Sequence, residues 1–271
     1  MKARIELGNR EVRVDLSNPV SLAIALDFSA SQPRHFGAPA ARSQPFSVPG
    51  FSGSVATGAS CNCQTLSLIP HCNGTHTECV GHLTREPVDA HRLAPSGLIP
   101  ALVVSVEPVE ATQTQGESTT PAPQRGDRLI TRRTLEKTWP PSLPFEPRAL
   151  VVRTLPNQPD KQHRDYSATT PPYLSREVAT LLVERNIEHL VVDLPSIDRA
   201  HDEGHLTAHR LFFGLPPGST ALAQAARAHA TITELAYIPD TAPDGPYLLE
   251  LQVPALGGDA VPSRPLLHPL L

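Results

Sequence analysis

The sequence LSREVATLLVERNIEHLVVDL, residues 174–194, decides the fold class of this chain. Its first part, residues 174–186, repeats Leu and Val at three- and four-residue intervals, which predicts a helix with one apolar face. Its second part, residues 189–194, is a short run of branched apolar residues and is typical of a buried strand. A similar run at residues 149–153 precedes both. Together these segments predict a strand, a helix and a second strand of one sheet.

Other segments extend this unit, and the size of the chain predicts a compact α/β or α+β domain. The remaining predicted elements are a hairpin of residues 3–7 and 11–16 around Gly8-Asn9, strands at 101–106 and 247–253, and helices at 204–213 and 221–230. We expect the strands at 101–106, 149–153 and 189–194 to pair in one sheet.

The length and charge of the chain limit its architecture and its partners. With 271 residues, 39% of them hydrophobic, the chain is long enough for a single domain, residues 1–271. The net charge of −4, without a run of basic residues, argues against a nucleic-acid partner. The first residues alternate charged and apolar types, unlike a signal peptide, and no apolar stretch reaches membrane-spanning length. We therefore expect a cytoplasmic protein that binds a small molecule.

Two segments without a regular pattern are expected to be loops. Residues 33–60 are rich in Pro, Gly, Ser and Ala, which predicts an extended segment that covers a site as a lid. Residues 107–127 are polar and low in complexity, which predicts a flexible surface loop.

All four cysteines lie between residues 61 and 79, which is a poor layout for a disulfide framework and indicates reduced thiols. Three of them, Cys61, Cys63 and Cys79, are interpreted as small buried residues beside a strand, because a CxC pair alone is a weak metal signal.

The segment HCNGTHTECVGH, residues 71–82, concentrates the residue types that carry chemistry. Histidine, cysteine and glutamate surround a Gly-Thr pair that allows a sharp turn. Imidazole nitrogen, thiolate sulfur and carboxylate oxygen are the donors that zinc and similar ions accept. The segment therefore predicts a metal site on a short loop.

This segment resembles the signature HxGTHxDxPxH of the cyclase and bacterial kynurenine formamidase family of metal-dependent hydrolases. Aligned on Gly74 and Thr75, the resemblance implies that His76 is a metal ligand and that Glu78 takes the position of the ligand aspartate. His82 takes the position of the catalytic histidine.

The first ligand position of the signature holds Cys72 instead of histidine, and His71 stands one residue earlier. Two interpretations stay open: Cys72 is the ligand, which favours zinc over manganese, or a local bulge brings in His71. We take Cys72 as the ligand. Glu78 is longer than aspartate by one methylene, and Val80 replaces the family proline.

The resemblance continues downstream and covers nearly the whole chain. VVDLPSID, residues 191–198, resembles a family strand with the turn that follows it. The family's second metal site uses a histidine and a glutamate beyond this turn. His201, His205 and His209 share one helical face by their four-residue spacing, and His209 matches best, with His205 as a less certain ligand. Glu234 supplies the glutamate, after an insertion relative to the family.

The resemblance implies a fold, an activity and an assembly. The fold is α+β, a swivelling β/β/α domain with a mixed sheet, flanking helices and long loops. The activity is hydrolysis of an amide or formamide C–N bond in a small carbonyl compound, such as N-formylkynurenine or a cyclic amide of the isatin type. One or two divalent ions, zinc or manganese, are the cofactors, and the assembly is a homodimer or a larger homo-oligomer.

The altered residues at Cys72, Glu78 and Val80 also motivate an alternative function. In that interpretation the chain is a catalytically silent relative that binds a metal or a metabolite.

Overall fold

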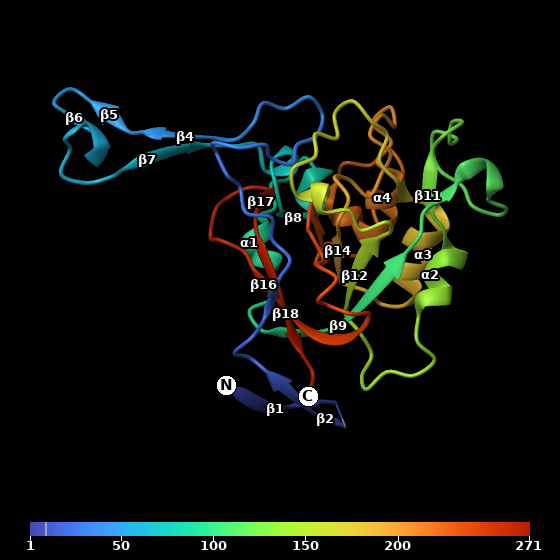
Figure 1. Cartoon of the computed structure of the whole chain (residues 1–271). Coiled ribbons are helices and arrows are strands. Elements are labelled where there is room, and N and C mark those ends of the chain that lie inside the picture. The colour runs from blue at the N-terminus through green and yellow to red at the C-terminus, as the bar shows by residue number, and fades with distance from the viewer. Residues whose placement is uncertain (9) are drawn as a thin grey trace.

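A computed structural model of the chain describes residues 1–8 and 10–271, and Figure 1 shows a body from which a thin ribbon projects. Within these ranges the body is built on a nine-stranded mixed sheet. Its strands, in spatial order, are β17 (Ala260–Pro262), β8 (His76–Cys79), β15 (Thr231–Glu234), β14 (His189–Val192), β12 (Ala149–Thr154), β9 (Leu98–Val106), β16 (Gly245–Gln252), β18 (Arg264–Pro269) and β3 (Val20–Ser21).

The four central strands, β9, β12, β14 and β15, run parallel, and their side chains are buried on both faces. Leu150 and Val152 of β12 pack into the core cluster on one face, whereas Val151 packs into the cluster on the other. This alternation explains why these strands are continuous apolar runs in the sequence. The predicted pairing of three strands in one sheet is confirmed, as is the α+β fold class.

The α-helices in the described ranges are short: α1 (Ala90–Leu93), α2 (Arg132–Thr138), α3 (Arg176–Glu184) and α4 (Thr207–Phe213). Helix α3 begins after Ser175, whose hydroxyl accepts a hydrogen bond from the Val178 N–H and caps the helix. Its apolar face packs on the same side of the sheet as α4, which Figure 1 shows beside β12 and β14. The helix predicted from residues 174–186 is confirmed.

The helix predicted for residues 221–230 is wrong, because the chain forms only a 3-10 turn there, Leu222–Gln224. The Ala226 N–H donates to the Gly214 carbonyl and the Arg227 N–H to the Phe213 carbonyl, so these donors cap the end of α4 instead of building a helix. Tertiary hydrogen bonds thus override a local helical preference.

Smaller sheets surround the main one. They are β10 (Val109–Glu110), β11 (Arg128–Ile130) and β13 (Tyr173–Leu174) in one sheet, and the pairs β1 (Lys2–Leu7) with β2 (Arg10–Asp15), β4 (Arg42–Pro45) with β7 (Gln64–Ser67), and β5 (Ser47–Val48) with β6 (Phe51–Ser52). The predicted N-terminal hairpin is confirmed, while Asn9 in its turn lies outside the described residues.

The two segments predicted as loops are more ordered than expected. Strands β4 to β7 form a ribbon, residues 42–67, which we call the arm. Figure 1 shows the arm pointing away from the main sheet, so it does not cover this chain's own sheet as a lid. Within residues 107–127, Ser118 hydrogen-bonds to Glu177 of α3 through both its N–H and its hydroxyl. In the described ranges, no helix has the length and apolar content needed to cross a membrane.

Candidate metal centre

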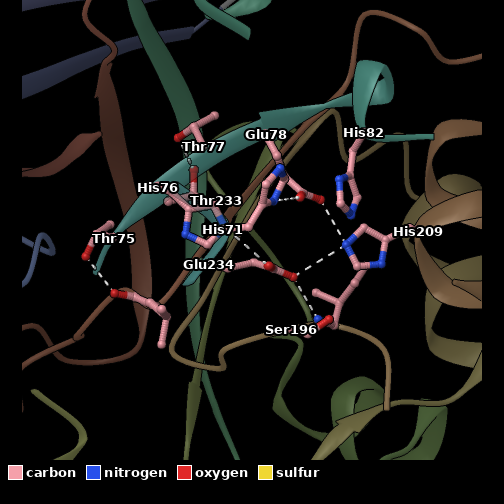
Figure 2. Close-up of polar contacts among 12 residues, drawn as sticks. His71, Thr75, His76, Thr77, Glu78, His82, Ser196, His209, Thr233 and Glu234 are labelled. Carbon is pink, nitrogen blue, oxygen red and sulfur yellow. Dashed lines mark hydrogen bonds and ion pairs between the residues drawn. The ribbon is translucent and has the colours of Figure 1, made fainter. Parts of the chain in front are cut away.

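Strand β8 presents the first two members of the site on one face. Successive side chains of a strand point to opposite faces, so His76 and Glu78 share a face while Thr77 lies on the other. Glu234 of β15 pairs directly with His76 in the antiparallel register and therefore joins the same face (Figure 2). The register of the sheet thus brings Glu234 to the site despite the insertion that precedes it.

Potential ligand atoms of seven residues gather around this face in overlapping groups, each within 4.8 Å. One group is His71, His76 and Glu78, a second is Glu78, His209 and Glu234, and a third is His71, His82 and Asp259. Glu78 belongs to the first two groups, so its carboxylate would be available as a ligand to an ion held by either group.

Buried polar atoms without a partner indicate that the first two groups fit a cation. Glu78 Oε2 lies 3.0 Å from His71 Nδ1, and Glu78 Oε1 lies 2.8 Å from His209 Nε2. Neither contact has the angular geometry of a hydrogen bond. Among the described residues, both Glu78 oxygens and His76 Nε2 lack a hydrogen-bond partner. Buried atoms left in this state are costly, and a divalent cation between them would satisfy all three.

Asp198 orients His209 from behind. Its carboxylate accepts hydrogen bonds from His209 Nδ1 at 2.7 Å and from the Ala208 and His209 N–H groups at the start of α4. With Nδ1 held in this way, Nε2 of His209 points toward Glu78. A carboxylate behind a histidine is the arrangement that orients metal ligands. Asp198 ends the turn Ser196-Ile197-Asp198 that follows β14, and this role could not be read from the sequence alone.

Backbone groups orient two further candidate ligands, His76 and Glu234. The His76 Nδ1–H donates to the Gly74 carbonyl at 3.1 Å, which leaves Nε2 bare. Glu234 Oε1 accepts from the Ile197 N–H at 2.8 Å. Gly74 has φ +74°, and an added Cβ would lie 2.9 Å from Leu26 Cδ2, which explains the glycine of the Gly-Thr pair.

Thr75, the second member of that pair, joins β8 to the end of β15. Its hydroxyl donates to the Leu235 carbonyl at 2.6 Å and accepts from the Ile24 N–H at 2.9 Å. Leu235 follows Glu234 and has φ 50°, an uncommon value for a residue with a branched side chain. This hydrogen bond therefore holds the backbone at the point where β15 delivers Glu234.

The structure brings His71, not Cys72, to the first ligand position. The 3-10 turn Pro70–Cys72 places the His71 ring against Glu78 and Asp259, as the alternative interpretation anticipated. Within the described residues, Cys72 belongs to none of the three groups. It is buried, and burial raises the pKa of its thiol. The assignment of Cys72 as a ligand is corrected accordingly, because a side chain one residue along this turn points elsewhere.

His82 and Asp259 form the part of the cluster nearest to solvent. His82 Nδ1 lies 3.3 Å from Asp259 Oδ2, and the same oxygen accepts from His71 Nε2 at 2.8 Å. Asp259 therefore orients two histidines at once. Asp259 follows two glycines directly before β17, and this local pattern alone does not indicate its role.

Opposite charges inside the cluster shift its protonation equilibria. Burial alone would raise the pKa of Glu78, but the charge of His209 and contacts with His209 and His71 hold that pKa well below its usual range. Burial lowers the pKa of His71, yet Asp259 and Glu78 raise it overall to about 10. Because a metal binds deprotonated imidazole, ions and protons compete for these nitrogens.

Other candidate residues lie apart from the cluster. Helix α4 begins only at Thr207, so His201 and His205 precede it and do not share a helical face with His209. His205 is exposed, and its assignment as a ligand is corrected. Cys61 and Cys63 are exposed on the arm, contrary to the prediction, whereas Cys79 is buried as predicted.

Comparisons with known proteins place this geometry in context. A family model described as "Putative cyclase" matches residues 14–199. No curated protein matches the sequence.

Solved structures with the same fold cover nearly the whole chain. One, described as a potential metal-dependent hydrolase with cyclase activity, is 16% identical, with a TM-score of 0.59 over 93% of this chain and 97% of its own. Another, described as a predicted metal-dependent hydrolase from Bacillus stearothermophilus, is 17% identical, with a TM-score of 0.56 over 93% and 98%. An isatin hydrolase bound to the product analogue thioisatinate is 14% identical, with a TM-score of 0.56 over 93% and 92%.

Proposed function

Because the chain belongs to the "Putative cyclase" family, we propose that it is a metal-dependent hydrolase that cleaves the C–N bond of a small amide. The observation that carries the proposal is the position of Glu78. Its two oxygens are buried without hydrogen-bond partners among the described residues, between one group that includes His71 and His76 and another that includes His209 and Glu234. This arrangement suits one or two divalent ions.

The metal that we propose is zinc, with manganese as the alternative. Imidazole and carboxylate donors, without a thiolate, accept both ions, and zinc binds the more strongly of the two. When bound, such an ion polarises a carbonyl group and acidifies water.

His82 is the proton carrier in this proposal. Asp259 holds its Nδ1 side, which leaves Nε2 able to take a proton from the attacking water. The same nitrogen then delivers the proton to the leaving nitrogen as the C–N bond breaks. His82 is partly exposed, so it can contact a substrate that enters from solvent.

The substrate that we propose is an arylamide, either an arylformamide such as N-formylkynurenine or a cyclic amide of the isatin type. Two observations support this class. A protein of the same fold is an isatin hydrolase, and Phe36 exposes an aromatic ring next to the buried His35.

The test combines metal analysis with turnover. We expect stoichiometric zinc or manganese in the purified protein and hydrolysis of N-formylkynurenine or isatin that His82→Ala abolishes. Protein without stoichiometric metal would exclude the proposal. Full metal occupancy without hydrolysis would instead support the silent, metal-binding relative.

We also propose that two copies of the chain associate through the arm. A two-stranded ribbon alone is marginally stable, yet the arm exposes large apolar side chains such as Phe46 and Leu66. Light scattering should report a dimer that Phe46→Asp with Leu66→Asp dissociates. The control is Leu256→Asp, an exposed leucine away from the arm, and dissociation by that variant would contradict the proposal.

We propose that the protein is located in the cytoplasm. This location is supported by the four free cysteines, two of them exposed. Fractionation of the native cells should recover the protein in the cytoplasm with four titratable thiols. Recovery from an oxidising compartment would contradict this location.

A further inference from the structure

His35 is a buried histidine that the metal centre does not use. Its side chain is only 1% exposed, and neither ring nitrogen has a hydrogen-bond partner among the described residues. The other histidines that are nearly fully buried, such as His189, hydrogen-bond through at least one ring nitrogen. An unpaired buried polar atom costs about 1–3 kcal/mol, so two of them on one ring require an explanation.

The loop that carries His35 is tightly built. Gln32 closes it, because its side-chain amide donates to the Asp27 and Ala41 carbonyls and its carbonyl accepts from the Ala41 N–H. Phe36, directly after His35, has φ 54°, an uncommon value for a bulky residue. Strained backbone held by well-made hydrogen bonds is characteristic of ligand-binding positions.

This loop also fixes His35 beside the metal centre. The His35 N–H donates to the Cys72 carbonyl at 3.1 Å, one residue from His71. Of the charged groups that act on the His35 ring, Glu234 has the largest influence. The loop that carries His35 is thus joined, through Arg34 and His35, to the backbone of residues 72 and 73, directly after His71.

The ring of His35 is suited to a neutral hydrogen-bonding role. Burial lowers its pKa to about 4, and the charge of Glu234 offsets this only in part. A neutral imidazole offers one N–H donor and one acceptor nitrogen. An ion-pair role is therefore excluded at neutral pH.

We propose that His35 is a substrate-binding residue that hydrogen-bonds to a second oxygen of the substrate, one that does not belong to the amide being cleaved. The inference rests on the proposed hydrolase function and narrows its substrate class. His82, in contrast, serves the leaving nitrogen of that amide. The preferred substrates are thus arylamides with an additional carbonyl group, which isatin has and formanilide lacks, while Phe36 lies beside the aryl ring.

The first experiment measures stability without substrate. His35→Leu removes two unpaired nitrogens at little change in volume, so we expect a melting temperature equal to or above that of the wild type. The matched control is His189→Leu, which breaks the hydrogen bond to Thr231 Oγ1 and should lower the melting temperature by several degrees. Equal losses in both variants would mean that His35 is structural and would overturn the inference. His35→Phe serves as a second apolar variant if the first does not fold.

The second experiment compares isatin with formanilide on the metal-loaded protein. His35→Leu should lower kcat/KM for isatin roughly 10-fold or more, since a lost hydrogen bond in a buried site has that effect. Its kcat/KM for formanilide should stay unchanged, and His189→Leu should change neither value. His35→Gln, which keeps a donor and an acceptor, should recover part of the preference.

The outcomes separate this inference from the function on which it rests. Equal loss on both substrates, or a preference that survives in His35→Leu, would overturn the role of His35 alone. If wild-type protein hydrolyses neither compound, calorimetry with thioisatinate decides: binding weakened in His35→Leu supports the inference, and binding unchanged by it overturns the inference. Failure of the metal-loaded wild type to bind thioisatinate would remove both the arylamide function and this inference.

Discussion

The cluster has a buried half and an open half that differ in exposure although they touch. The buried half is Glu78, His209 and Glu234, whose side chains are 1–4% exposed. The open half is His71, His82 and Asp259, at 24–41%. Strands and a helix supply the buried half, whereas 3-10 turns and the loop before β17 supply the open half. Rigid elements thus hold candidate ligands where water is excluded, and short turns supply His71 as a further candidate ligand together with the more accessible His82 and Asp259.

The largest effect is expected from Glu78→Gln, because this residue belongs to both ligand groups in the centre. Loss of its charge should reduce bound metal and lower kcat/KM on the order of 10³-fold or more, since metal stabilisation of the transition state amounts to several kcal/mol. Elemental analysis and kinetics measure both. Glu250→Gln, a carboxylate paired with His268 outside the cluster, is the control and should change neither.

The next effect tests the open half alone. His82→Ala should keep the metal content of the wild type and lower kcat by about 10²–10⁴-fold, the usual contribution of a proton-transfer group. The exposed His91→Ala is the control. Loss of metal in His82→Ala would contradict the role of His82 as a proton carrier, because His82 would then act as a ligand.

A smaller effect distinguishes the carboxylates behind the two halves. Asp198→Asn should weaken metal affinity by about 10–100-fold and lower the free energy of unfolding, because Asp198 also caps α4. Asp259→Asn should lower kcat with little change in stability, since Asp259 is partly exposed. Competition with a chelator and chemical denaturation measure the two quantities. Identical profiles for the two variants would refute the comparison.

The smallest effect is expected from Cys72→Ala. Its thiol lies outside the cluster, so metal affinity should stay unchanged while stability falls by about 1 kcal/mol through lost packing. His71→Ala, one residue earlier, should lower metal affinity, because it removes the candidate ligand that belongs to the open half. A thiol of Cys72 that becomes protected only when metal is added would restore Cys72 as the ligand.

The central fold could be predicted from sequence because burial on both faces leaves continuous apolar runs. Residues 149–153 and 189–194 carry that pattern, and capping by Ser175 supports the helix between them. Residues 221–230 misled the prediction, since their helical preference is local and the hydrogen bonds to Gly214 and Phe213 are not. The sequence of the arm indicates turns, but it carries no signal for the direction of the ribbon relative to the main sheet.

The candidate site could be predicted where the spacing and the order of the residues match those of the family signature. His76, Glu78 and His82 follow from the spacing of the signature, and His209 and Glu234 from their order along the chain. The exchange of Cys72 for His71 depends on the direction of a 3-10 turn, which sequence does not specify. Asp198, Asp259 and His35 were missed because their significance lies in contacts between segments distant in the chain.

The strand order β17-β8-β15 sets when the metal centre can form during synthesis. Strand β8 carries His76 and Glu78, but both of its neighbours, Thr231–Glu234 and Ala260–Pro262, follow it by more than a hundred residues. Chains emerge from the ribosome in sequence order, so the signature segment cannot form its two strand pairs until residues 231–262 have followed it. A chain that stops before residue 231 therefore carries the signature without Glu234 and without the strand partners of β8, and the candidate metal centre forms only after these later strands have been made.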